Sequence, residues 1–240
     1  MSYKNYLIFD LDDTILDFKK GEQEGLNKIF KKHMVPDVRF DQWLLIFQRV
    51  NSRIWSQIEE GASAKELLET RFSKTYQEFG IEKDGRLLES EYRSYLDQNF
   101  FVLKGAKEML EQLKKQNFQV VAGTNGKSST QRSRLKGTGL EPFFEDVVIS
   151  EEIGYAKPHQ KFFEILMDRN KGMKTQNTLM IGDSLRSDIQ GAINSGIRNI
   201  WFNPFKNENA TEIIPDFEVA TFEELQQIIE LNSGIKQNSK

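Results

Sequence analysis

The 240-residue chain contains no cysteine, which excludes disulfide bonds, thiolate metal sites and a cysteine nucleophile. Its two histidines, His33 and His159, are too few for a histidine-rich metal centre. No apolar run approaches the roughly 20 residues that span a bilayer, so we expect no membrane partner. The N-terminal segment lacks the apolar stretch and small-residue cleavage site of a secretory signal, which predicts a cytoplasmic protein.

A dominant charge of one sign is also absent. The chain has 33 basic and 36 acidic side chains, a formal net charge of −3, and no basic block. Nucleic-acid-binding proteins usually carry a basic face, so we expect no nucleic-acid partner. The hydrophobic content of 38% and the aromatic content of 11% are too high for a disordered chain. A chain of this length can bury a large core, so a folded, helix-rich protein remains.

Five short apolar runs predict strands, and helical patterns lie between most of them. Because strands and helices alternate, we predict an α/β fold with a mostly parallel, Rossmann-like sheet and helices on both faces. Ligands of such sheets bind beyond the carboxyl ends of the strands. The predicted strands are 6–9, 118–122, 146–149, 178–181 and 199–202. The predicted helices of this region are 105–116, 128–137, 158–169 and 185–194.

The stretch from residue 17 to residue 101 breaks this alternation. Between residues 43 and 58, apolar side chains recur at intervals of three and four, which places them on one helix face. A second such face covers 68–79, and a Ser-x-x-Glu capping box at 63–66 predicts where that helix begins. We predict a helical domain inserted into the sheet domain; the alternative is that these helices extend the main core. The predicted domains are 17–101 and, for the sheet, 1–16 with 102–240, which ends in a polar tail from Asn232 to Lys240.

Four polar blocks follow the predicted strands, and the first is Asp10-Leu11-Asp12-Asp13-Thr14. Its three carboxylates lie within four residues and repel one another unless a positive charge neutralises them. Oxygen ligands of this kind suit a hard cation, above all Mg²⁺. Taken alone, the block is equally consistent with a solvated turn in which Thr14 caps a helix.

The second block, Gly123-Thr124-Asn125-Gly126, offers a hydroxyl and free backbone N–H groups near a helix start, which can hold an anion. The alternative is an ordinary strand-to-helix turn capped by Thr124 or Asn125. The third block places Lys157 directly before Pro158, and proline is common at the first helical position. A lysine at a helix start is unfavourable unless an anion is bound nearby.

The fourth block, Gly182 to Asp188, puts Asp183 directly after a strand. Asp183 could complete the cation site that Asp10 begins, or it could cap the next helix, with Asp188 as an exposed acid of the first turn. Together, the four blocks supply carboxylates, a hydroxyl, backbone donors and a lysine at the carboxyl ends of strands. That set fits phosphoryl transfer, which needs cations to hold the phosphate and an oxygen nucleophile.

In their order along the chain, the four blocks resemble the four motifs of the haloacid dehalogenase superfamily of phosphatases. The helical insertion resembles the C1 cap of that superfamily. Other segments resemble its YjjG-like pyrimidine 5′-nucleotidases, among them Arg134-Leu135, Val148 to Glu152 and Trp201 to Pro204. Positions of the insertion that also resemble this subfamily, with no contact assigned to them, are Asn51, Trp55, Glu60, Gly61 and Arg71.

The resemblance implies that Asp10 attacks phosphorus and becomes an aspartyl phosphate, while Asp12 protonates the leaving oxygen and then activates water. It implies that Thr124 and the backbone N–H groups near Asn125 hold phosphoryl oxygens. Lys157 would neutralise charge on the nucleophile and the phosphate. The implied cofactor is Mg²⁺. Its implied ligands are Asp10, the backbone carbonyl of Asp12, and Asp183, with Asp188 as a further ligand or the neighbour of one.

The implied activity is Mg²⁺-dependent hydrolysis of a small-molecule phosphate ester, in particular a pyrimidine nucleoside 5′-monophosphate. Asp12 favours a phosphatase over a dehalogenase, because dehalogenases of the superfamily do not use an acid at this position; a phosphomutase keeps it. A phosphatase of phosphoglycolate or a sugar phosphate remains open, as does a non-catalytic nucleotide-binding protein. We expect the inserted helices to set specificity. At their base, Phe18 could stack on a nucleobase or pack at the hinge.

Overall fold

The structure, a computed structural model, describes residues 5–232 and divides into two compact units. Of the described residues, the sheet unit contains 5–17, 102–128 and 138–232, and the helical unit contains 18–101 and 129–137. Within residues 5–232, no helix combines the length and the apolar character needed to cross a membrane. Of the predicted polar tail, Asn232 is the last described residue, and residues 233–240 lie outside the described part.

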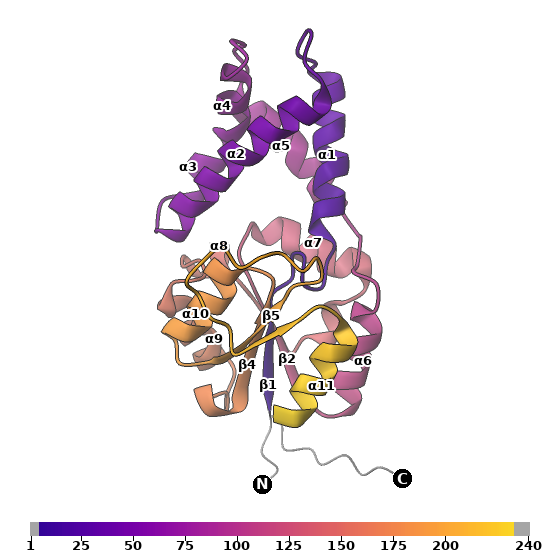
Figure 1. Ribbon diagram of the computed structural model, residues 1–240, viewed down its shortest axis with the longest axis vertical. Helices are drawn as coiled ribbons and strands as arrows, with labels where there is room; N and C mark the ends of the chain where they lie inside the picture. Colours follow the sequence, from indigo (N-terminus) through magenta and orange to yellow (C-terminus); the bar gives the residue numbers. More distant parts are fainter. Residues whose placement is uncertain (1–4, 233–240) are drawn as a thin grey trace. The chain divides into compact units, whose positions relative to one another are not determined.

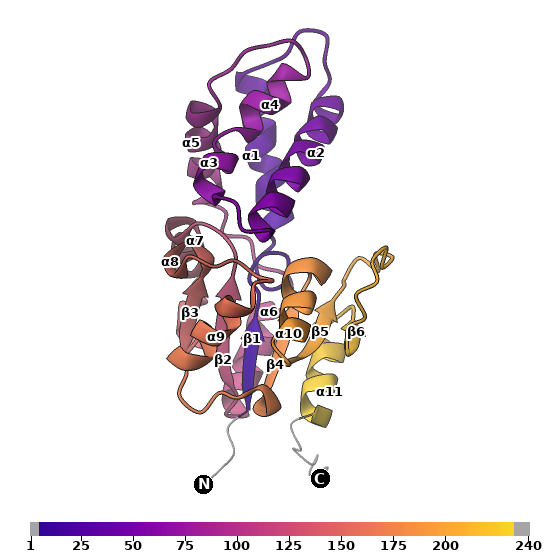
Figure 2. The same cartoon turned by 90° about the vertical axis from the view of Figure 1, so that its left-hand side faces the viewer.

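Six strands form the sheet: β1 (Tyr6–Phe9), β2 (Gln119–Thr124), β3 (Asp146–Ile149), β4 (Thr178–Gly182), β5 (Arg198–Phe202) and β6 (Phe217–Val219). All neighbouring pairs are parallel, in the order β3-β2-β1-β4-β5-β6 (Figure 2). Phe9 pairs with Ala122 on one side and with Ile181 on the other. The central strands therefore end level with one another, and the segments that follow them start at one edge of the sheet. The predicted parallel α/β architecture is confirmed.

Helices cover both faces of this sheet. The α-helices of the unit are α6 (Ala106–Lys115), α8 (Ser150–Ile153), α9 (Gln160–Arg169), α10 (Gln190–Asn194) and α11 (Phe222–Asn232). A π-helical turn (Leu185–Ile189) leads into α10, and 3₁₀ turns cover Glu141–Phe143 and Thr175–Asn177. In Figure 1, α9 and α10 lie on one face of the sheet and α6 and α11 on the other. Both faces of the central strands are buried, which explains their continuous apolar runs.

One local expectation for this unit is wrong, and three elements were not predicted. Helix α9 begins at Gln160 rather than at Pro158, because the His159 ring caps it by accepting a hydrogen bond from the backbone N–H of Lys161 at 3.1 Å. Lys157 therefore lies outside the helix start. The sequence patterns also missed β6, α8 and α11, of which β6 has only three residues and α8 only four.

The helical unit is built from α1 (Phe18–Lys32), α2 (Phe40–Glu59), α3 (Ala64–Leu68), α4 (Arg71–Gln77), α5 (Gly85–Leu96) and most of α7 (Ser128–Thr138). Its core is aromatic. The ring centroids of Trp43 and Phe47 lie 5.5 Å apart in a stacked arrangement, and Phe72 packs edge-on against Tyr92 at 5.4 Å. These side chains come from α2, α4 and α5, so the cluster holds the three helices together.

The helix predicted over 68–79 is in fact interrupted. It forms α3 and α4 with a break at Thr70, and the side chain of Ser63 makes no capping hydrogen bond. At the break, the Thr70 hydroxyl donates to the carbonyl of Leu67 at 2.7 Å. Gly85 of α5 packs so tightly here that a Cβ atom on it would collide with the carbonyl oxygen of Glu69. Tertiary packing has overridden the helical periodicity of this segment.

Helix α7 follows β2 in the sequence, yet residues 129–137 pack with the helical unit. The hydroxyl of Thr130 donates to the Asp97 carboxylate at 2.6 Å. The Nε atom of Arg134 donates to the backbone carbonyl of Asn99 at 3.2 Å. These polar contacts join segments far apart in sequence, so the periodicity of α7 could not have assigned it to this unit.

Candidate active site

Asp10 directly follows β1, and its side chain is buried. Its backbone N–H donates to the carbonyl of Ile181 at 2.9 Å, which extends the sheet by one residue beyond β1. The chain then turns sharply, because the carbonyl of Leu11 accepts hydrogen bonds from the N–H groups of residues 14–16 and Asp13 adopts a positive φ of 56°. Asp12 lies in this turn and is partly exposed. The first acid is thus held rigidly while the second remains accessible.

Lys157 is fully buried, and its ammonium group contacts three oxygen atoms of the site. Nζ lies 2.7 Å from Oδ1 of Asp10 and 2.7 Å from Oδ1 of Asp188, and it donates to the carbonyl of Gly123 at 2.6 Å. Burial opposes the charged form of the lysine, but the carboxylates of Asp10 and Asp188 outweigh burial and raise its pKa. Lys157 therefore carries a fixed positive charge.

The carboxamide of Asn125 fixes the backbone of Lys157. Its Nδ2 donates to the Lys157 carbonyl at 2.9 Å, and the Lys157 N–H donates to its Oδ1 at 2.8 Å. This pair of bonds ties the end of β2 to the segment before α9. The side chain of Asn125 therefore positions Lys157. From the sequence we expected a different role, in which the backbone N–H groups near Asn125 hold phosphoryl oxygens.

Three carboxylates gather beside the lysine. Asp10, Asp183 and Asp188 each offer an oxygen atom, and these oxygens lie within 4.8 Å of one another. Asp188 is held by the N–H of Ser184, which donates to its Oδ2 at 3.0 Å. The indole of Trp201 donates to the backbone carbonyl of Asp183 at 2.8 Å. Such a set of hard oxygen donors, drawn from two strand ends, fits a divalent cation of the Mg²⁺ type.

The same crowding affects the protonation of Asp10. Burial raises its pKa to about 7, the charge of Lys157 acts in the opposite direction, and the carboxylates of Asp188 and Asp12 add to the increase. One ammonium group does not fully offset this many acids. A cation bound among them would favour the ionised form of Asp10.

The turn after β2 differs from the expectation of free N–H groups. Thr124 is buried at the strand end, and its hydroxyl donates to the carbonyl of Asn125 at 3.3 Å. The N–H of Gly126 donates to the hydroxyl of Ser150 at 3.0 Å, and that of Ser128 donates to the Glu151 carboxylate at 2.9 Å. These two donors are therefore already satisfied. Sequence reasoning missed the part played by Ser150 and Glu151, although their position directly after a predicted strand was an available signal.

The structure brings together most of the predicted site residues at one edge of the sheet unit. Phe18 belongs to the helical unit, where it packs against the aromatic core and under the guanidinium group of Arg134, whose carbon lies 5.3 Å from the ring centroid. Its predicted stacking on a nucleobase stays a prediction. The residues that share the sheet unit are Asp10, Asp12, Thr124, Asn125, Lys157, Asp183 and Asp188.

Comparison with known proteins identifies the family of this chain. The model of the family described as "haloacid dehalogenase-like hydrolase" matches residues 7–202 of the chain, which include every acid of the site. The chain belongs to this family. The resemblance inferred from the four motifs is thereby confirmed, and this haloacid dehalogenase-like hydrolase is an enzyme.

Relatives of the hydrolase match it along almost its whole length. The pyrimidine 5′-nucleotidase PynA of Streptococcus pneumoniae is 39% identical over 233 residues, 97% of each chain. The pyrimidine 5′-nucleotidase YjjG of Escherichia coli is 31% identical over 226 residues, 94% of this chain and 97% of that protein. A crystal structure of YfnB from Bacillus subtilis, bound to magnesium, superposes with a TM-score of 0.86 at 37% identity. That alignment covers 95% of this chain and 99% of YfnB.

Proposed function

We propose that this hydrolase is a Mg²⁺-dependent phosphatase of nucleoside 5′-monophosphates, with pyrimidine nucleotides preferred. The observation that carries the reaction is the contact of Lys157 with Asp10 and Asp188 beside Asp183. One ammonium group and a cation-binding cluster converge on a single carboxylate that can act as a nucleophile. The nucleotide preference is supported by two relatives that are pyrimidine 5′-nucleotidases.

In the first step, a carboxylate oxygen of Asp10 forms a bond to phosphorus and the P–O bond to the ester oxygen breaks. Asp12 gives its proton to the leaving oxygen, so the alcohol departs neutral. Lys157 offsets the negative charge of Asp10 and of the phosphoryl oxygens. The hydroxyl of Thr124 turns from the carbonyl of Asn125 and donates instead to one of these oxygens. The product of this step is an acyl phosphate on Asp10.

In the second step, water gives a proton to Asp12 and forms a bond to phosphorus, while the P–O bond to Asp10 breaks. Inorganic phosphate leaves and the carboxylate of Asp10 is restored. Mg²⁺, held by Asp10, Asp183 and the backbone carbonyl of Asp12, with Asp188 beside them, would neutralise charge and allow an anionic nucleophile to approach an anionic ester.

In this proposal the helical unit serves as the cap that recognises the substrate, and the partner of the enzyme is a small phosphate ester. The predicted domain limits, the cytoplasmic location and the absence of nucleic-acid and membrane partners stay predictions.

A panel of phosphate esters tests the proposed reaction. We expect higher kcat/KM for dUMP, UMP and CMP than for AMP, phosphoglycolate or ribose 5-phosphate, and loss of turnover in EDTA that Mg²⁺ restores. Turnover that persists without a divalent cation, or no turnover of any ester, would contradict the mechanism. Preference for phosphoglycolate or a sugar phosphate would retain the mechanism and replace the substrate. Chloride release from a haloacid would favour a dehalogenase instead.

A further inference from the structure

The backbone at Asp183 is held by a side chain that the proposed chemistry does not use. The parallel register of β4 with β5 ends with Gly182 opposite Trp201, so Asp183 is the first residue beyond this ladder (Figure 2). The indole Nε1 of Trp201 donates to the carbonyl of Asp183 at 2.8 Å. A side-chain donor thus continues the hydrogen bonding between the two strands one residue past the point where their backbone ladder stops.

The position of Trp201 in the sheet suits a fixed anchor. It is 5% exposed, and its strand lies between β4 and β6. Side chains alternate along a strand, so Trp201 and Phe202 point to opposite faces of the sheet. Phe202 stacks on Phe222 of α11 with ring centroids 4.8 Å apart, which leaves the indole on the face that carries α9 and α10 (Figure 1). Buried on this face, the indole has little freedom to move away from Asp183.

Further contacts of the same segment fix the neighbouring acid, Asp188. Its Oδ2 accepts from the N–H of Ser184 at 3.0 Å, and its Oδ1 lies 2.7 Å from Nζ of Lys157. Asp183 completes the cluster of three carboxylates and is the partly exposed member. The hydrogen bond from Trp201 therefore acts on the backbone of the acid that lies nearest to solvent.

We propose that Trp201 is a positioning residue of the cation site, because its indole fixes the backbone of Asp183 and thereby the direction of that carboxylate. The inference rests on the proposed function, since it concerns the Mg²⁺ that the acids would hold. Mg²⁺ requires near-octahedral geometry with ligands at about 2.0–2.1 Å, so a small shift of one ligand weakens binding. Loss of a group that orients a metal ligand typically lowers metal affinity by about 10–100-fold. We expect the lower end of this range, because the indole bonds to the backbone and not to the carboxylate.

Trp201→Phe removes the N–H donor and keeps an aromatic ring at this position of β5. Isothermal titration calorimetry of the substrate-free protein with MgCl₂ should give a Kd about tenfold higher than that of the parent, while kcat at saturating Mg²⁺ stays within about twofold. A purely structural defect would lower Tm and the active fraction at every Mg²⁺ concentration and would leave the Kd of the folded molecules unchanged. Phe202→Leu is the matched control, because it disturbs the other buried aromatic contact at this end of β5. Its Kd for Mg²⁺ should match that of the parent.

Nuclear magnetic resonance gives a second readout that needs no variant of Trp201. The chain has three tryptophans, and each indole N–H gives its own signal in a proton–nitrogen correlation spectrum. We expect MgCl₂ to shift the signal of Trp201, assigned by triple-resonance experiments. The signal of Trp43, which is buried in the aromatic core of the helical unit, should stay in place. Asp183→Asn should abolish most of the shift of Trp201.

Three results would overturn the inference and leave the proposed function intact. These are a Kd for Mg²⁺ in Trp201→Phe equal to that of the parent, an equal increase in Phe202→Leu, and a Trp201 signal that does not respond to MgCl₂. A parent protein that neither binds Mg²⁺ nor needs it for turnover would overturn the proposed function as well.

Discussion

Nζ of Lys157 lies 2.7 Å from Oδ1 of Asp10, although 147 positions separate the two residues in the sequence. Neither group is accessible enough for water to screen the interaction, since the side chains are 1% and 9% exposed. The contact therefore couples the charge of the proposed nucleophile directly to that of the lysine. The energetic and catalytic consequences can be measured separately.

Lys157→Met removes the ammonium group and leaves Asp10 and Asp188 as buried acids without their counter-charge. Loss of one partner from a buried ion pair costs about 3–5 kcal/mol, so we expect a decrease of this order in the free energy of unfolding. Phosphatase activity should fall by at least about 100-fold. Urea denaturation and initial rates measure the two effects. Lys161→Met is the control, because Lys161 is exposed and should tolerate the change; wild-type stability in Lys157→Met would contradict the assigned ion pair.

Asp10→Asn replaces the nucleophilic carboxylate by an amide of nearly the same shape. We expect turnover to fall by at least about 1,000-fold while circular dichroism and Tm stay close to those of the parent. A neutral side chain here also removes one of the crowded negative charges, so the fold has no electrostatic reason to fail. A variant with the parent's rate would show that the nucleophile is a different residue.

Gly182→Ala tests the close packing of Asp188 against the end of β4. A Cβ atom on Gly182 would collide with the Asp188 carboxylate, so this side chain must move. We expect a several-fold higher Mg²⁺ concentration for half-maximal activity. Gly80→Ala is the matched control. Gly80 has a φ of +69° and no atom near its Cβ position, so alanine there adds only backbone strain of about 1 kcal/mol. Equal Mg²⁺ dependence in both variants would refute the role of Asp188 at the cation site.

Mg²⁺ should stabilise the folded chain through the acidic cluster. A ligand at 100 times its Kd contributes about 2.7 kcal/mol of stability, so Tm should rise on titration with MgCl₂. Asp183→Asn removes one carboxylate of the cluster and should abolish most of this rise. Differential scanning calorimetry gives the result independently of any substrate. A rise that is as large in Asp183→Asn as in the parent would place the cation elsewhere.

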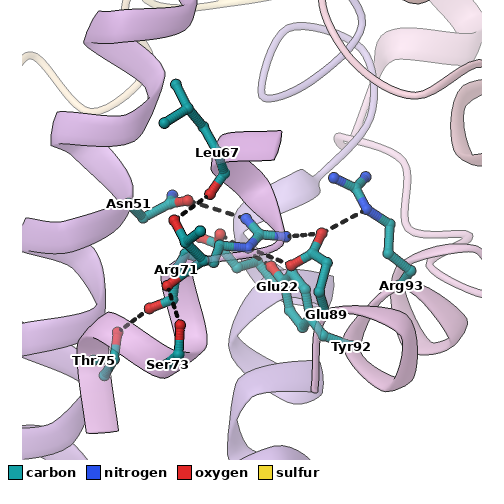
Figure 3. Close-up of polar contacts among 10 residues, drawn as sticks. Glu22, Asn51, Leu67, Arg71, Ser73, Thr75, Glu89, Tyr92 and Arg93 are labelled. Atoms are coloured by element: carbon teal, nitrogen blue, oxygen red, sulfur yellow. Dashed lines mark hydrogen bonds and ion pairs between the residues drawn. The ribbon is translucent and has the colours of Figure 1, made fainter. Parts of the chain in front are cut away.

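Arg71 and Glu89 should show strong coupling in a double-mutant cycle. Glu89→Leu leaves the buried Arg71 without its ion-pair partner (Figure 3) and should cost about 3–5 kcal/mol. Arg71→Met should cost less, because Glu89 still accepts a hydrogen bond from Nε of Arg93 at 2.8 Å. The double variant removes both charges and should be less destabilised than the sum of the single variants, by about 1 kcal/mol or more. Urea unfolding followed by far-ultraviolet circular dichroism measures these free energies. Additive losses would show that the two side chains act independently.

Much of the sheet unit follows from local patterns. The five strands were predicted from short apolar runs, and most residues of these runs are buried in the structure. The site motifs were predicted from the acidic and polar residues that directly follow the runs. Local patterns failed where distant residues decided the outcome. The break at Thr70 depends on the close approach of Gly85, and the start of α9 depends on the ring of His159. Trp55 adjoins the periodic apolar face of α2 without belonging to it, and its indole is partly exposed in the folded helical unit.

Strand and helix periods and the residues at strand ends are local properties, so the amino-acid sequence sufficed for the class of fold and the inventory of reactive groups. Which of these groups meet was settled only when the chain folded. Folding joined Lys157 to Asp10 and Asp188, and Arg71 to Glu89 and Asn51. Such contacts depend on the register of parallel strands and on the packing of helices. Register and packing result from many weak interactions between residues that are far apart in the sequence. Charge, burial and orientation at the site therefore become defined only in the folded molecule.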